Sequence, residues 1–145
     1  MALVGRIFVI LFALWLATMA AGIVWSIGLL GQQWASSGDP GEQIVFWGTA
    51  FLASGMTAAF IFMPTLIAVA LAEAFSVRSL LLYAASGGAL MLLAHQGASL
   101  GRYEESIDKV PPAIARETEI AAAAGVAFGL VYWLIAGRKA GVWKK

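Results

Sequence analysis

The sequence predicts an all-α protein that forms a bundle of four transmembrane helices. Its composition is 61% hydrophobic and 12% charged, with a mean hydropathy of +0.87, whereas soluble domains contain about a quarter charged residues. Residues 43–72 carry no charge, and a helix of that length reaches about 45 Å, more than the roughly 30 Å hydrocarbon core of a bilayer. We therefore expect residues 1–145 to form a single integral membrane domain.

The first transmembrane helix is expected at residues 5–30. Arg6 followed by an apolar run is also typical of a secretory signal, but this run continues to Leu30, beyond the length of a signal peptide. We therefore expect an uncleaved membrane helix. Residues 31–42 are rich in turn-forming residues and carry only acidic charge, which predicts a loop outside the membrane.

The second transmembrane helix is expected at residues 44–72 and contains Pro64. A proline inside a helix removes one backbone hydrogen bond and crowds the preceding turn, so we expect a kink before it. The hydroxyl groups of Thr57 and Thr65 could donate to the carbonyl groups that the proline leaves free.

A short connection leads to the third transmembrane helix, which is expected at residues 77–96 with Ser76 as its N-cap. Because so few residues join them, we expect the second and third helices to be antiparallel neighbours that form a hairpin.

The main hydrophilic segment, residues 97–119, follows the third helix. Its first half carries apolar side chains at helical spacing, which predicts an amphipathic segment lying on the membrane between the third and fourth helices. These side chains are Leu100, Tyr103, Ile107 and Val110. Pro111 and Pro112 end that segment, and the fourth transmembrane helix is expected at residues 118–137.

The distribution of charge predicts that both termini are cytoplasmic. The expected side of the termini and of the short connection carries one acidic residue, Glu73, and six basic residues: Arg6, Arg78, Arg138, Lys139, Lys144 and Lys145. Acidic residues prevail on the other side. Short flanking segments rich in lysine and arginine remain in the cytoplasm.

Several kinds of chemistry are excluded or unsupported by the residue types. The chain has no cysteine, which excludes disulfides and cysteine-bound clusters. Its expected helices carry charge only at their ends, although proton relays need ionisable groups at membrane depth. The single histidine, His95, is interpreted as a hydrogen-bonding residue at the interface, with a pigment or cofactor ligand as the alternative. With no catalytic motif present, we expect no enzyme, no catalytic or metal site and no cofactor.

Small residues at helical spacing predict where helices approach one another closely, because backbone proximity drives helix association in lipid. The fourth helix has Ala121, Gly125 and Gly129, the third has Ala84 and Gly88, and the second has Gly55. We assign these residues to helix-packing interfaces. Packing within this chain is the favoured interpretation, and contact with another subunit is the alternative.

Charged residues outside the helices suggest two further sites. Glu73 and Arg78 flank the short connection, where we expect an ion pair or a juxtamembrane anchor to lipid headgroups. Glu104, Glu105 and Asp108 lack the spacing of a calcium loop. We interpret them as a solvated face, with docking of a basic partner as the alternative.

Two segments carry a resemblance to a known group of proteins. Residues 101–108 with Pro111 and Pro112, together with residues 128–138, resemble small four-span inner-membrane proteins of proteobacterial type. The resemblance covers the C-terminal third and includes no chemical motif. It implies a multi-pass protein of the bacterial inner (plasma) membrane and no catalytic residue.

These observations favour a non-enzymatic accessory or assembly subunit that packs against a larger membrane complex, of respiratory or photosynthetic type. Its expected partners are the lipid bilayer and other membrane-protein subunits, and not nucleic acid. The alternative is a small homo-oligomeric channel or facilitator. Its pathway would be lined by hydroxyl-bearing residues, namely Thr49, Ser54, Thr57, Thr65, Tyr83 and Ser86.

Overall fold

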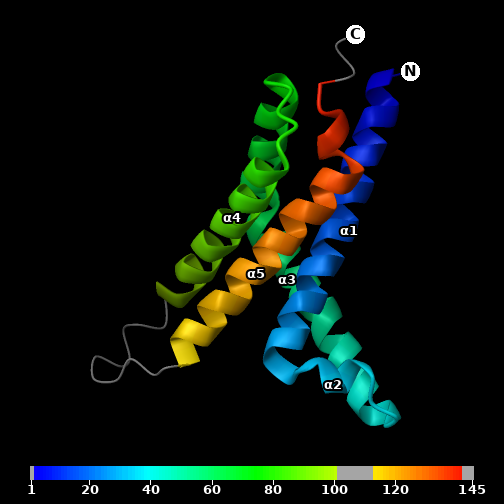
Figure 1. The fold of residues 1–145 in the computed structure, drawn as a ribbon, viewed down its shortest axis with the longest axis vertical. Coiled ribbons are helices and arrows are strands. Elements are labelled where there is room, and N and C mark those ends of the chain that lie inside the picture. The colour runs from blue at the N-terminus through cyan, green and yellow to red at the C-terminus, as the bar shows by residue number, and fades with distance from the viewer. Residues whose placement is uncertain (1, 101–112, 142–145) are drawn as a thin grey trace.

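The computed structural model of the protein describes residues 2–100 and 113–141, and within these ranges the chain is all-α. In order, its helices are α1 (Ala2–Leu30), α2 (Gln32–Ala35), α3 (Pro40–Ala74), α4 (Leu80–Leu100) and α5 (Ala113–Ile135), followed by the 3₁₀ turn η2 (Gly137–Lys139) (Figure 1). Among the described residues, α1, α3, α4 and α5 are long and apolar enough to cross a membrane. The predicted fold class is confirmed.

The second membrane helix begins earlier than the sequence suggests. α3 starts at Pro40 and not at residue 44, because Asp39 caps it by accepting a hydrogen bond from the Gly41 N–H at 2.8 Å. Proline at the first helical position needs no partner for a missing N–H group and has a helical φ. Much of the expected loop 31–42 is therefore helical, as α2 and the first turn of α3.

The connection between α3 and α4 also differs from the prediction. Ser76, the expected N-cap of the third helix, has a left-handed backbone with φ 53°. The Val77 N–H donates to the Ala72 carbonyl at 2.8 Å, which is the pattern of a Schellman motif at a helix C-terminus. Ser76 therefore ends α3, and α4 begins only at Leu80.

The four long helices do not pack as two sequential hairpins. α5 lies along both α4 and α1, and α1 lies along α3, whereas α3 and α4 have little direct contact. The two helices diverge from their connection, and α5 crosses in front of α3 (Figure 1). α3 and α4 are thus joined as a hairpin by a short connection, but each packs mainly against another helix: α4 against α5, and α3 against α1.

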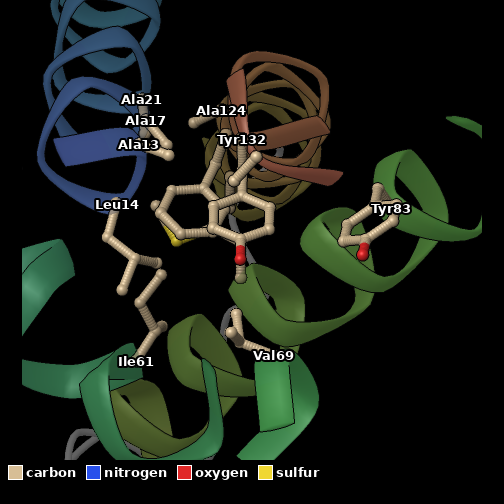
Figure 2. Packing of buried hydrophobic residues seen from close by; sticks show 13 residues of the cluster. Ala13, Leu14, Ala17, Ala21, Ile61, Val69, Tyr83, Ala124 and Tyr132 are labelled. Atoms are coloured by element: carbon tan, nitrogen blue, oxygen red, sulfur yellow. The ribbon is translucent and has the colours of Figure 1, made fainter. Parts of the chain in front are cut away.

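The core is built mainly from small side chains. Ala13, Ala17 and Ala21 are fully buried on one face of α1, opposite Ala121 and Ala124 of α5. Figure 2 shows this alanine face of α1 beside Ala124 and Tyr132. Methyl groups on both sides let the two helices approach closely, which replaces the hydrophobic effect as the source of association in lipid.

α3 uses only one of its faces for packing within the chain. Its buried residues recur every three or four positions and form the inward stripe of α3, comprising Phe46, Ala50, Ser54, Thr57, Ile61, Thr65, Val69 and Glu73. An added Cβ on Gly22 of α1 would overlap the Ser54 side chain, so the two helices are in close contact there. The other faces of α3 are exposed along most of its length.

Candidate functional site

A polar cluster joins three parts of the chain at one end of the bundle. Arg6 of α1 forms an ion pair with Glu73 at the end of α3, with its Nε 3.0 Å from the Glu73 Oε1. The Arg6 Nη2 also donates to the Ala136 carbonyl at 2.7 Å. Glu73 is buried, with 8% of its surface exposed. A buried carboxylate requires such partners, because burying an unpaired charge is costly.

The segment after α5 completes this cluster. The Gly141 N–H donates to the Glu73 Oε2 at 2.8 Å, and the Arg78 Nε donates to the Ala140 carbonyl at 3.1 Å. The beginning of α1, the α3–α4 connection and the segment after α5 therefore lie at the same end of the bundle. This shared end agrees with the charge distribution of the sequence.

The two residues expected to flank the connection have different surroundings. Glu73 is buried in the cluster with Arg6, whereas Arg78 is exposed and contacts the C-terminal segment. Sequence reasoning did not include Arg6 in this site. The signal was present, since Arg6 and Glu73 have opposite charges near the ends of two expected helices that lie on the same side of the membrane.

Trp133 brings two arginines together next to this cluster. Its indole N–H donates to the Arg78 carbonyl at 2.8 Å, and the Arg138 guanidinium carbon lies 5.6 Å from the centroid of the indole ring. That distance is within the range of a cation–π interaction. Arg78, Arg138 and Lys139 are all exposed, and we refer to these three residues as the basic rim.

A cavity of about 300 Å³ lies between α3, α4 and α5 and begins beside the basic rim. Val77, which precedes Arg78, lines the cavity, and its carbonyl accepts a hydrogen bond from the Tyr83 hydroxyl at 3.1 Å. Tyr83 and Tyr132 also line it, with ring centroids 5.6 Å apart. We call this space the α3–α4 cavity; its walls are almost entirely apolar.

One buried hydroxyl group beside this apolar space has no partner in the described chain. The buried Thr65 Oγ1 makes no hydrogen bond, so the expectation that Thr65 satisfies a carbonyl freed by Pro64 is wrong. Tyr132 also lines the cavity, and its hydroxyl points toward Val69 of α3 (Figure 2). An unpartnered buried hydroxyl costs free energy, so Thr65 favours a ligand that supplies an acceptor.

A second cavity, of about 370 Å³, lies between α1, α3 and α4 toward the other end of the bundle. His95 lines it, and its ring lies 6.0 Å from that of Trp25. No group of three or more His, Cys, Asp or Glu side chains that could hold a metal occurs in the part of the chain that the structure describes.

The small residues of α4 and α5 form a tight helix contact. An added Cβ on Gly129 would lie 3.0 Å from the Ala84 Cα and would overlap the Tyr83 carbonyl. One on Gly125 would lie 2.7 Å from the Met91 Cβ. We refer to this contact as the glycine seam.

Of the other residues assigned to packing, Ala121 and Gly88 lie in helix contacts within the bundle, and Gly55 lies on its surface. Ala121 is fully buried toward α1, and a Cβ on Gly88 would lie 3.3 Å from the Val126 Cγ2. Gly87 is the seam residue that sequence reasoning missed, since a Cβ there would lie 3.1 Å from the Gly129 Cα. Gly55 is exposed, and a Cβ there would meet nothing within 4 Å.

The acidic residues Glu104, Glu105 and Asp108, and the expected amphipathic segment around them, lie outside the described residues. Their suggested role in docking a basic partner stays a prediction.

The fold and these contacts define a helix-bundle integral membrane protein with four helices able to span the bilayer. Comparison with protein-family models, with curated proteins and with solved structures gives no match.

Proposed function

We propose that this protein is a non-enzymatic accessory or assembly subunit that binds another membrane protein through the outward face of α3. The proposal includes a location in the bacterial inner membrane with both termini cytoplasmic, as the basic residues at their shared end favour. The observation that carries it is the single-sided packing of α3. This helix has 35 residues, yet it buries one stripe toward the bundle, and its other faces are exposed along most of their length.

The outward face of α3 has the residues that favour a helical partner. Gly55 and Ala59 are exposed at i and i+4, and Gly48 is exposed two turns before Gly55. An added Cβ on Gly48 or Gly55 would meet nothing within 4 Å, so a second backbone has room to approach there. Large apolar side chains such as Phe51 and Leu52 stand beside them, 70% and 68% exposed. A small groove between large side chains suits another transmembrane helix.

The proposal is tested by gentle solubilisation from the native membrane, followed by sizing and identification of copurifying proteins. We expect the wild-type chain to migrate with a larger complex, and Gly55→Leu to release it as a free chain. Gly5→Leu is the matched control, since Gly5 is also exposed on a helix with nothing within 4 Å of an added Cβ. Migration of the wild-type protein only as a monomer or small homo-oligomer would contradict the proposal.

The channel hypothesis has one observation in its favour. Thr65, Tyr83 and Ser86 line the α3–α4 cavity, and Thr49 and Thr57 line the second cavity. Ser54, in contrast, donates to the Ala50 carbonyl inside the α1–α3 contact. Solute flux in reconstituted vesicles, lost on Thr57→Leu, would support this function, and the absence of flux across a panel of ions would count against it.

A further inference from the structure

We propose that the α3–α4 cavity and the basic rim together bind one anionic phospholipid. In this arrangement the basic rim holds the phosphate, a hydroxyl group inside the cavity donates to an ester carbonyl, and an acyl chain lies along the apolar wall. This inference does not rest on a role as a subunit, because it concerns a different face of the molecule from the outward face of α3.

The charge of the rim selects an anion. Arg78 and Arg138 contact the same indole ring from different directions, through the Arg78 carbonyl and the Arg138 guanidinium. The carboxylate nearest to them, Glu73, is already paired with Arg6. The exposed charge that the rim presents is therefore positive. Basic side chains at a membrane helix end attract anionic headgroups.

The cavity explains why the ligand is a lipid and not a free anion. Its mouth adjoins the rim, since Phe75 and Val77 of the connection line it, and it extends to Leu90, nearly three helical turns along α4. Apolar side chains such as Leu71, Leu82 and Leu90 form its walls. A water-filled space with such walls is unfavourable inside a bilayer, whereas an acyl chain fills it without loss of a hydrogen bond.

The unpartnered hydroxyl of Thr65 identifies the class of lipid. Thr65 of α3 and Tyr132 of α5 are 4% and 3% exposed and line the same cavity. Both carry a hydroxyl donor, and that of Thr65 has no partner within the described residues. A phospholipid with ester-linked chains offers carbonyl oxygens directly below its phosphate, between the charged rim and the apolar wall. An ether-linked lipid lacks these acceptors, which makes the assignment testable.

The first experiment measures lipid binding to purified, delipidated protein in a mild detergent by native mass spectrometry. The probes are phosphatidylglycerol, phosphatidylethanolamine and water-soluble glycerol phosphate. We expect one phosphatidylglycerol per chain, bound about tenfold or more tightly than phosphatidylethanolamine. Equal binding of the two lipids would overturn the role of the rim. Displacement of phosphatidylglycerol by an equal concentration of glycerol phosphate would overturn the role of the cavity.

Substitutions separate the three contacts. Arg78→Gln with Arg138→Gln should reduce the preference for phosphatidylglycerol to near parity, while Arg116→Gln at the other end of α5 should not. Ala68→Phe should abolish binding, because Ala68 lines the cavity. Ala70→Phe, exposed two residues further on α3, is its matched control. Thermal unfolding of both variants shows whether each is folded, and binding retained by a folded Ala68→Phe variant would overturn the proposal.

A third comparison keeps the proposal falsifiable if the cavity-filling variant does not fold. Thr65→Val with Tyr132→Phe changes little volume and removes both hydroxyls. It should weaken ester-linked phosphatidylglycerol several-fold, as expected for lost hydrogen bonds, and leave the ether-linked analogue unchanged. An equal effect on both lipids would contradict an ester contact.

Discussion

α4 is closely packed on one side and open on the other. Toward α5, Gly87, Gly125 and Gly129 bring the two backbones so close that an added methyl group would overlap main-chain atoms. Toward α3, to which α4 is joined by a short connection, there is little contact and a cavity of about 300 Å³. Chain connectivity therefore does not decide which helices pack. The positions of glycine decide it, because close backbone approach is the main source of helix association in lipid.

The largest effect is expected from breaking the glycine seam. Gly129→Leu places a large side chain against the Tyr83 carbonyl and the Ala84 backbone, neither of which can move without separating α4 from α5. Extra methylene groups in a packed core cost about 1–3 kcal/mol. A whole leucine side chain against main-chain atoms should cost more than that, and we expect loss of the folded bundle. Unfolding in mixed detergent micelles, followed by circular dichroism, measures this effect.

Leucine substitutions at two other glycines provide controls for Gly129→Leu. Gly137→Leu should be milder, since the nearest atoms to an added Cβ belong to the Tyr83 and Trp133 side chains, which can rotate. Gly55→Leu, exposed on α3, should change the free energy of unfolding by no more than about 0.5 kcal/mol. Equal tolerance of all three substitutions would show that the glycine seam contributes nothing.

The second largest effect is expected at the polar cluster, which connects α1, α3 and the segment after α5 at one end of the bundle. Glu73→Gln leaves Arg6 without a carboxylate in a site where the two side chains are each 10% exposed. Removing one member of a buried pair destabilises a protein by about 3–5 kcal/mol, and we expect the lower end here because Arg6 keeps its bond to the Ala136 carbonyl.

A double-mutant cycle with Arg6→Gln tests the pairing. Loss of both charges should cost less than the sum of the two single substitutions, because no unpaired charge remains. Additive effects would contradict a direct interaction between the two side chains.

The smallest effect is expected on the open side. Thr65→Val removes the buried Oγ1 that has no partner and keeps the branched shape of the side chain. Delipidated protein should gain about 1 kcal/mol in its free energy of unfolding, since an unsatisfied buried hydroxyl is destabilising. A loss of stability in the same unfolding measurement would show that the hydroxyl has a partner in solution.

The sequence analysis succeeded where one residue pattern has one physical meaning. Long uncharged stretches can be satisfied only by membrane helices, and all four expected helices are present. Gly125 and Gly129, which the sequence assigned to packing, lie against the backbone of α4. Gly55 has the same kind of spacing but faces outward. A small residue allows a neighbouring helix to approach closely, but it does not show whether a neighbour is present.

Other features depended on the register between helices. Gly87 and Gly88 are adjacent in the sequence, and only the rotation of α4 about its axis makes Gly87 the closer contact with α5. Arg6 and Glu73 are far apart in the chain, and their pairing follows from the packing of α1 against α3. Hydropathy predicts neither the rotation of α4 nor the packing of α1 against α3, since all faces of these helices are apolar enough for lipid.

The order of the residues is enough to establish that this chain is helical and that it has four helices apolar enough to cross a membrane. These properties follow from local rules. An unpaired charge or an unsatisfied backbone polar group in hydrocarbon is unfavourable in free energy, and capping residues favour helix ends. Only the tertiary structure decided which helices touch, which glycines are buried and where a cavity meets a basic surface. Those outcomes depend on small differences in fit among several apolar faces, which side-chain chemistry alone does not distinguish.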